Sequence, residues 1–160
     1  MIGPIQSLIR DERGASLIEM ALIAPVLACL LIGLVDLSRG YAAKLKLEQA
    51  AESTIETVQQ QGYTHDTTSS PTSLQVLQTE AVARAGTGSS AIATAYRECR
   101  SGATRTVVDF DTDCTAGYTA ARYVAIQITQ TYSPMFSTRF GGSNTDGSFT
   151  LVAKAAIRIQ

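Results

Sequence analysis

The stretch Arg13-Gly14-Ala15-Ser16-Leu17-Ile18-Glu19 runs directly into an apolar segment, Met20 to Val35, and this junction decides the fold. Residues 15–35 would form a helix about 31 Å long, which matches the roughly 30 Å hydrocarbon core of a bilayer. The sequence therefore predicts a membrane-crossing helix that begins close to Ala15 and carries one carboxylate, Glu19, near its start.

The Glu19 carboxylate is unusual because the segment that follows it excludes charge. A charge at the centre of a membrane helix costs about 2.5–3.5 kcal/mol, and the cost falls toward the ends, where Glu19 lies. Cutting the chain after Gly14 would create an α-amino group on Ala15, about one helical turn away or presented by a neighbouring copy, that neutralises this carboxylate. Gly14 has no side chain, so it leaves the backbone open to a protease. Processing between Gly14 and Ala15 would thus supply the partner of Glu19.

The N-terminus resembles the type IV prepilins, and within them the TadE-like group of the tight-adherence pilus system. The resemblance implies cleavage between Gly14 and Ala15 by a membrane aspartyl prepilin peptidase on the cytoplasmic side, with Glu19 serving assembly. A small residue such as Ala15 is usual in the TadE-like group, whereas the best-known type IV pilins have Phe there. The residues that carry the resemblance are Arg13, Gly14, Ala15, Glu19, Pro25, Gly33, Asp36, Arg39, Gly40 and Tyr41.

Two features of the apolar segment suit packing against another helix. Ala24 and Ala28 form a small-xxx-small pair that allows close approach, and Pro25 removes one backbone hydrogen bond. Ordinary membrane-helix composition, in which Ala, Gly and Pro are common, explains the same residues equally well.

Composition limits the other classes of function. The chain has 160 residues, 45% of them hydrophobic and 17% charged, which suffices for one membrane segment and one modest domain. A formal net charge of −1 without a dense basic cluster argues against nucleic-acid binding. Basic residues flank both ends of the apolar segment, so its orientation depends on the peptidase-site interpretation. A cleaved secretory signal is the main rival, although no Ala-x-Ala site closes the segment.

Periodicity predicts the elements beyond the membrane. Apolar residues at helical spacing over 43–58 extend the first helix to Gly62, and Ser70 followed by Pro71 predicts a second, shorter helix that ends at Gly86. Alternating residues predict a hairpin over 91–110 and two antiparallel strands at 123–132 and 149–159. We expect an α+β, pilin-like fold in which a long N-terminal helix packs on a small antiparallel sheet. Its parts would be a leader (1–14), the transmembrane half-helix (15–37) and an exported domain (38–160).

Few residues suggest chemistry. Cys99 and Cys114 bracket a short polar loop and are expected to form a disulfide worth about 3 kcal/mol, whereas Cys29 lies in the apolar helix as a small hydrophobic residue. The carboxylates of 109–113 fail the EF-hand pattern, because Cys114 replaces Gly and Ala120 replaces Glu. They are interpreted as a solvated strand edge, with an irregular calcium site as the alternative. With a single histidine, His65, and no nucleophile-base pair, the sequence predicts no enzyme activity, no metal and no cofactor.

The sequence thus predicts a minor pilin or pseudopilin, a structural component of tight-adherence pilus biogenesis that serves adhesion or secretion. By the resemblance, its partners are prepilin peptidase, other pilin and pseudopilin subunits, the inner-membrane assembly platform and membrane lipid. The protein would cross the bacterial inner membrane once, with its C-terminal domain in the periplasm or on an extracellular pilus. The alternatives are a permanently anchored binding domain that never polymerises and a secreted domain that begins beyond Val35.

Overall fold

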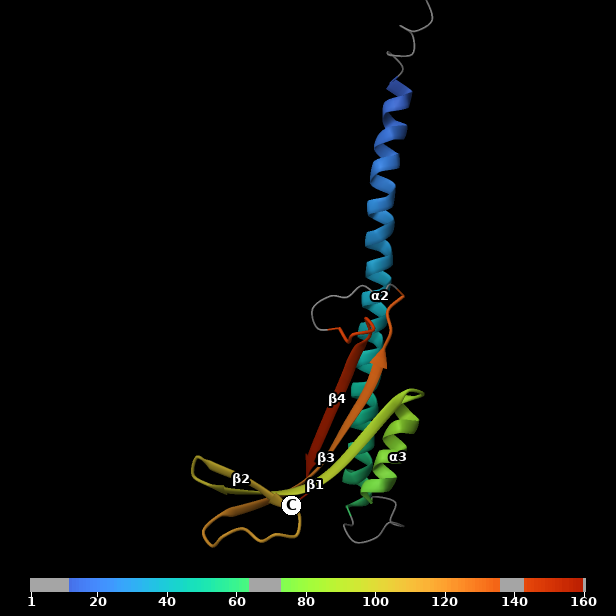
Figure 1. Cartoon of the computed structure of the whole chain (residues 1–160). Coiled ribbons are helices and arrows are strands. Elements are labelled where there is room, and N and C mark those ends of the chain that lie inside the picture. Colours follow the sequence, from blue (N-terminus) through green and yellow to red (C-terminus); the bar gives the residue numbers. More distant parts are fainter. Residues whose placement is uncertain (1–11, 64–72, 136–142, 160) are drawn as a thin grey trace, which may run out of the picture. The chain divides into compact units, whose positions relative to one another are not determined.

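The computed structural model describes residues 12–63, 73–135 and 143–159. Along the chain the elements are α2 (Glu12–Gln61), α3 (Leu74–Ala85), β1 (Ser89–Ser101), β2 (Thr104–Asp109), β3 (Thr119–Tyr132) and β4 (Phe149–Arg158) (Figure 1). The predicted α+β class is therefore confirmed. The chain divides into two compact units, Met1–Arg39 and Gly40–Gln160, which are described separately.

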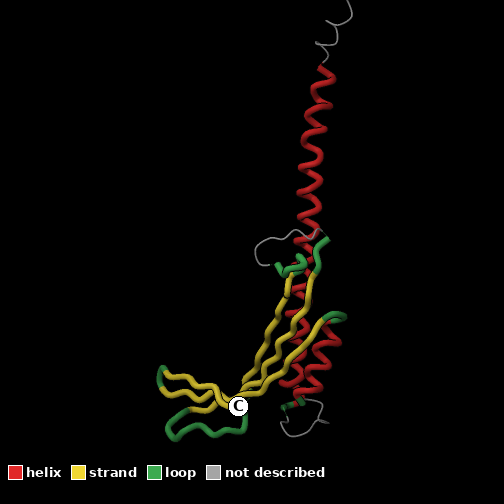
Figure 2. The backbone as a smooth tube through the Cα atoms, in the orientation of Figure 1, coloured by secondary structure: helices red, strands yellow, loops and turns green. Residues whose placement is uncertain are grey.

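The four strands form one antiparallel sheet in the order β2-β1-β3-β4 (Figure 2). The alternation that predicted β3 is visible in its burial, because Val124, Ile126 and Ile128 are 0%, 2% and 0% exposed. Ile126 lies opposite Ala93 on β1 and Ala155 on β4, so one face of the sheet presents a continuous apolar row. The two predicted C-terminal strands and the 91–110 hairpin are thus confirmed, with ends shifted by a few residues.

The core of the second unit forms where both helices meet this face of the sheet. The C-terminal half of α2 contributes an apolar stripe at helical spacing. The second stripe comes from α3, the helix that lies beside β1 (Figure 1). The α2 helix ends at the predicted position because Gly62 has a φ of +74°, a left-handed conformation that terminates helices. The buried members are Leu47, Ala50, Ala51, Ile55, Val58, Leu77, Ala81, Ala85, Ala93, Val124, Ile126, Ile128 and Ala153.

The predicted start of α3 was wrong. Ser73 is the N-cap, and its hydroxyl accepts a hydrogen bond from the Val76 N–H at 3.4 Å. Ser70 and Pro71, which the sequence favoured for this role, lie outside the described residues. The predicted end is confirmed, because the Gly86 N–H donates to the Val82 carbonyl at 2.9 Å.

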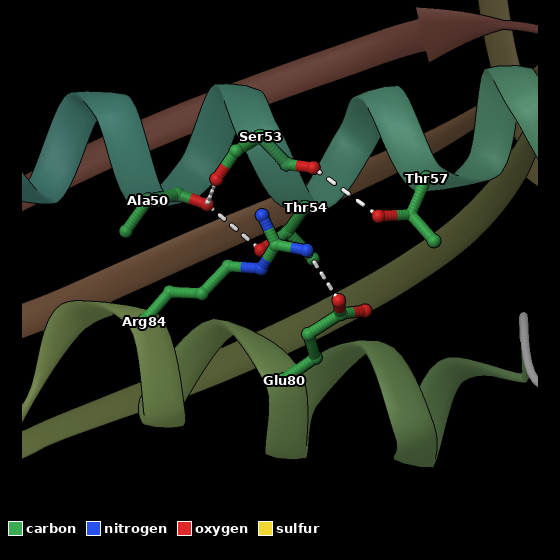
Figure 3. Close-up of polar contacts among 6 residues, drawn as sticks. All are labelled: Ala50, Ser53, Thr54, Thr57, Glu80 and Arg84. Carbon is green, nitrogen blue, oxygen red and sulfur yellow. Dashed lines mark hydrogen bonds and ion pairs between the residues drawn. The ribbon is translucent and has the colours of Figure 1, made fainter.

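One polar side chain of α2 is fully buried, and its hydroxyl group is hydrogen-bonded. Thr54 is 0% exposed, and its hydroxyl donates to the Ala50 carbonyl one turn earlier, at 2.7 Å (Figure 3). Ser53 and Thr57 make the same kind of backward hydrogen bond. On α3, Arg84 and Glu80 form an ion pair at 2.5 Å, with side chains that are 38% and 29% exposed (Figure 3). Local pairing therefore allows Thr54 to occupy an otherwise apolar helix face.

Replacing Leu77 by Ala tests the packing of α3. Leu77 is 0% exposed and belongs to the core cluster, so Leu77→Ala should lower the free energy of unfolding by about 2–5 kcal/mol. The measurement is chemical unfolding of the full chain in detergent micelles, followed by circular dichroism. Gln75→Ala on the exposed side of the same helix is the control and should change stability by less than about 0.5 kcal/mol. Equal effects of the two substitutions would contradict this packing.

Candidate functional site

The predicted processing site lies at the N-terminal end of α2. The helix begins at Glu12, so the backbone of Gly14 and Ala15 is already helical. The Glu19 side chain is exposed, and no other residue of the described ranges forms an ion pair with it. The backbone of Ala15 and that of Glu19 are about one helical turn apart along α2. The carboxylate is thus available for a partner that processing or a second chain would supply.

The helix around Glu19 exposes its apolar side chains. Ser16–Gln61 is long and apolar enough to cross a membrane, and its most apolar 18-residue window has a mean hydropathy of 2.5. None of that window is buried against the rest of the described chain. Leu17 is 73% exposed and Leu31 63% exposed. Exposed apolar surface of this extent on a continuous helix requires lipid or other protein around it.

The residues predicted for helix packing are available on this surface. Ala24 and Ala28 are exposed, and α2 continues through Pro25 without a break. A shallow apolar hollow lies beside them, lined by Pro25, Val26, Cys29 and Leu30. The small side chains and the hollow leave room for a neighbouring helix to approach closely.

Two residues just beyond the apolar segment connect α2 to the sheet. A Cβ atom added at Gly40 would lie 3.3 Å from Cε1 of Tyr132, the last residue of β3. The Lys44 ammonium donates a hydrogen bond to the main-chain carbonyl of Val152 on β4 and pairs with Glu48 at 3.1 Å. Gly40 therefore permits close packing of α2 on the sheet, a role that its place in the N-terminal motif did not reveal.

The cysteines and the acidic run meet at the end of the sheet. A disulfide joins Cys99 on β1 to Cys114 in the β2–β3 loop, with a Cα–Cα distance of 5.6 Å. Asp109 accepts a hydrogen bond from the Phe110 N–H, and Asp113 pairs with Arg97. Within the described ranges, no three His, Cys, Asp or Glu side chains are grouped so that they could hold a metal ion.

Sequence reasoning missed two polar residues and misplaced one apolar residue. Arg97 and Glu98 are 4% and 8% exposed, although adjacent charged residues on a strand usually face solvent. Glu98 is paired with Arg100 at 3.2 Å and with Arg105 at 2.7 Å. Apolar Met135 and Phe136 beside Pro134 are predicted by their sequence to plug the core rather than to form an exposed contact tip. Met135 is instead 64% exposed, and Phe136 lies outside the described residues.

A tyrosine at the end of α2 has a perturbed ionisation. The rings of Tyr63 and Phe110 pack edge to face with their centroids 5.4 Å apart. Burial raises the pKa of Tyr63, and the Asp111 carboxylate raises it further. The neutral phenol therefore stabilises the fold below its ordinary pKa of 10.0, and this contribution is lost as the pH rises toward the higher pKa of the folded state.

Replacing Tyr63 by Phe should make stability less dependent on alkaline pH. Above about pH 10, the free energy of unfolding of the parent should fall more steeply than that of Tyr63→Phe. Unfolding curves across this range test the difference, in a Cys29→Ser background that prevents thiol exchange. Tyr41→Phe is the control, because the Tyr41 side chain is 66% exposed, and it should follow the parent. Parallel curves for the parent and Tyr63→Phe would contradict the prediction.

Comparison with known proteins agrees with the N-terminal geometry. Residues 14–54 match the family model described as TadE-like protein. No curated protein and no solved structure matches the chain. The matched range begins at Gly14, contains the whole exposed apolar half of α2 and extends into the half that packs on the sheet. The recognition of a TadE-like segment from the sequence is thus confirmed.

Proposed function

We propose that this protein is a minor pilin or pseudopilin of the tight-adherence pilus system and that its role is structural. The observation that carries the proposal is the coincidence of the TadE-like range, 14–54, with an exposed apolar helix that has a lone carboxylate near its start. An ionised group at the edge of hydrocarbon calls for a partner, and a new amino terminus at Ala15 would be one. The TadE-like match covers residues of α2 alone and does not itself assign a role in adhesion or secretion. That role is therefore part of the proposal.

Processing and topology follow from this proposal. Prepilin peptidase cuts between Gly14 and Ala15 on the cytoplasmic side and removes the leader 1–14. Residues 15–37 then hold the protein in the bacterial inner membrane, and 38–160 fold in the periplasm or on the assembled pilus. The disulfide between Cys99 and Cys114 fits an oxidising compartment on that side of the membrane.

Assembly is mechanical in this account. The exposed apolar half of α2 passes from lipid, through the assembly platform, into contact with other pilin or pseudopilin subunits. Helices can approach closely at the small residues Ala24 and Ala28, beside Pro25. Glu19 pairs with the amino terminus of its own chain or of a neighbouring subunit. The protein makes and breaks no covalent bond itself, and the proposal assigns it no enzyme activity and no cofactor.

The N-terminus of protein isolated from the native envelope tests this function. We expect mass spectrometry to identify a mature chain that begins at Ala15 and remains in the membrane or pilus fraction. A chain that keeps Met1 would show a permanently anchored binding domain instead. A soluble chain that begins beyond Val35 would show a secreted domain. Either of these results would overturn the proposed function.

A further inference from the structure

The β2–β3 loop is attached to β1 at two neighbouring points. Cys114 is joined to Cys99 by the disulfide, and Asp113 Oδ1 lies 2.5 Å from Arg97 Nη1. Arg97 and Cys99 are two residues apart on β1, so they share one face of the sheet. Because Asp113 and Cys114 are adjacent in the chain, the covalent attachment keeps the carboxylate beside the guanidinium.

The two partners of this ion pair differ sharply in burial. The Arg97 side chain is 5% exposed, whereas the Asp113 side chain is 95% exposed. The Arg97 Nε is buried and has no hydrogen-bond partner among the described residues. A buried cation depends strongly on its counterion, while an exposed carboxylate is readily hydrated and gains little from the pair. Without the disulfide, the Asp113 carboxylate would move from Arg97 into solvent. Arg97 would then be a buried cation without its counterion.

Loss of the Asp113 charge would also affect the residues around Arg97. Arg97 lies directly opposite Arg122 on β3, so two cations share this row of the sheet. The Arg122 guanidinium carbon is 5.2 Å from the centre of the Phe110 ring, and Phe110 in turn packs edge to face on Tyr63, which follows α2. Phe110 is 7% exposed and lies between β2 and the acidic residues of the same loop. The loop is therefore linked through Arg122 and Phe110 to the end of α2.

We propose that the Cys99–Cys114 disulfide is a redox latch that keeps Asp113 on Arg97 and thereby holds Phe110 against Tyr63. In the oxidised protein the loop is closed. In the reduced protein the loop leaves Arg97, and the contact between Phe110 and Tyr63 opens. This device is independent of leader processing and of filament assembly.

A dithiol would open the latch by thiol–disulfide exchange. Its first thiolate attacks the sulfur of Cys114, the less buried of the two cysteines, and the Cys99 thiolate leaves and takes up a proton. The second thiol of the reductant then resolves the mixed disulfide and releases Cys114 as a thiol. The protein gains two electrons and two protons, and the dithiol becomes a cyclic disulfide.

The test follows the Tyr63 ring in the full-length chain. The Cys29→Ser protein is labelled with ¹³C-tyrosine in detergent micelles, and its spectrum is recorded oxidised, after dithiothreitol and after reoxidation. Tyr63→Phe assigns the signal. We expect reduction to shift the Tyr63 ring signal to that of a solvent-exposed tyrosine, reoxidation to restore it, and the exposed Tyr41 to remain unchanged. An unshifted Tyr63 signal, with Cys99 and Cys114 both labelled as free thiols, would overturn the latch.

A substitution separates the ion pair from the disulfide. Asp113→Asn with the disulfide intact should shift the Tyr63 signal part of the way in the same direction. Thr112→Ala changes an exposed side chain in the same loop and should leave the signal in place. If Asp113→Asn has no effect, or if Thr112→Ala has an equal one, the coupling does not pass through Arg97 and the proposal fails.

Discussion

A Glu19→Gln variant should insert into the membrane as the parent does, be processed to the same Ala15 N-terminus, and enter pili poorly. Glutamine is uncharged, so insertion is no harder than for glutamate. In the assembled helices, however, the amino terminus of Ala15 would be buried without a counterion. Removing one partner of a buried ion pair costs about 3–5 kcal/mol, so subunit association should weaken by roughly a hundredfold or more.

The measurement compares the amount of this chain in the sheared pilus fraction with the amount in the membrane fraction. Glu56→Gln is the matched control, because Glu56 is an exposed glutamate on the same helix beyond the apolar half. It should leave the ratio unchanged. N-terminal analysis of both variants separates an assembly defect from a processing defect. Pilus content equal to the parent, with Glu19→Gln correctly processed, would remove Glu19 from the assembly mechanism.

The elements most accurately predicted from the sequence are those in which one face is uniformly apolar. The alternation at 123–132 defines β3, and the three- and four-residue spacing of Leu47, Ala51 and Ile55 defines the packed half of α2. These patterns are local, so no knowledge of distant contacts was required. The start of α3 was predicted at the wrong serine, because Ser70 and Ser73 both precede the same apolar stripe and both are good caps.

The features that escaped prediction depend on contacts between distant parts of the chain. Gly40 faces Tyr132, and Lys44 reaches the Val152 carbonyl on β4. Arg97 is buried because the β2–β3 loop folds back over β1. Neither the alternation of apolar residues nor the hydropathy of the sequence predicts this position of the loop. At the candidate site, the prediction from sequence is limited for a different reason. Gly14, Ala15 and Glu19 are recognisable from sequence because their chemistry is local, whereas the helices they would meet belong to other molecules.

Replacing Gly14 by Val should leave the leader attached and leave the protein unassembled in the membrane. Two physical effects of the substitution can be separated. Because Gly14 and Ala15 lie inside α2, a peptidase that requires extended backbone must first unwind this turn, and Val in place of Gly makes unwinding harder by only about 0.3–0.5 kcal/mol of helix propensity. That effect alone would slow cleavage by roughly twofold.

A branched side chain beside the scissile bond adds steric exclusion from the peptidase, so Gly14→Val should be cleaved at least about a hundredfold more slowly than the parent, a barrier increase of about 3 kcal/mol. Gly14→Ala should fall between them, and Gly3→Val, which changes a glycine elsewhere in the leader, should be processed normally. Pulse-chase gels and N-terminal sequencing give the rates. Mature protein that begins at Ala15 and forms at the parental rate from Gly14→Val would show that this glycine is not read by a peptidase, and the amino group proposed to meet Glu19 would then need another origin.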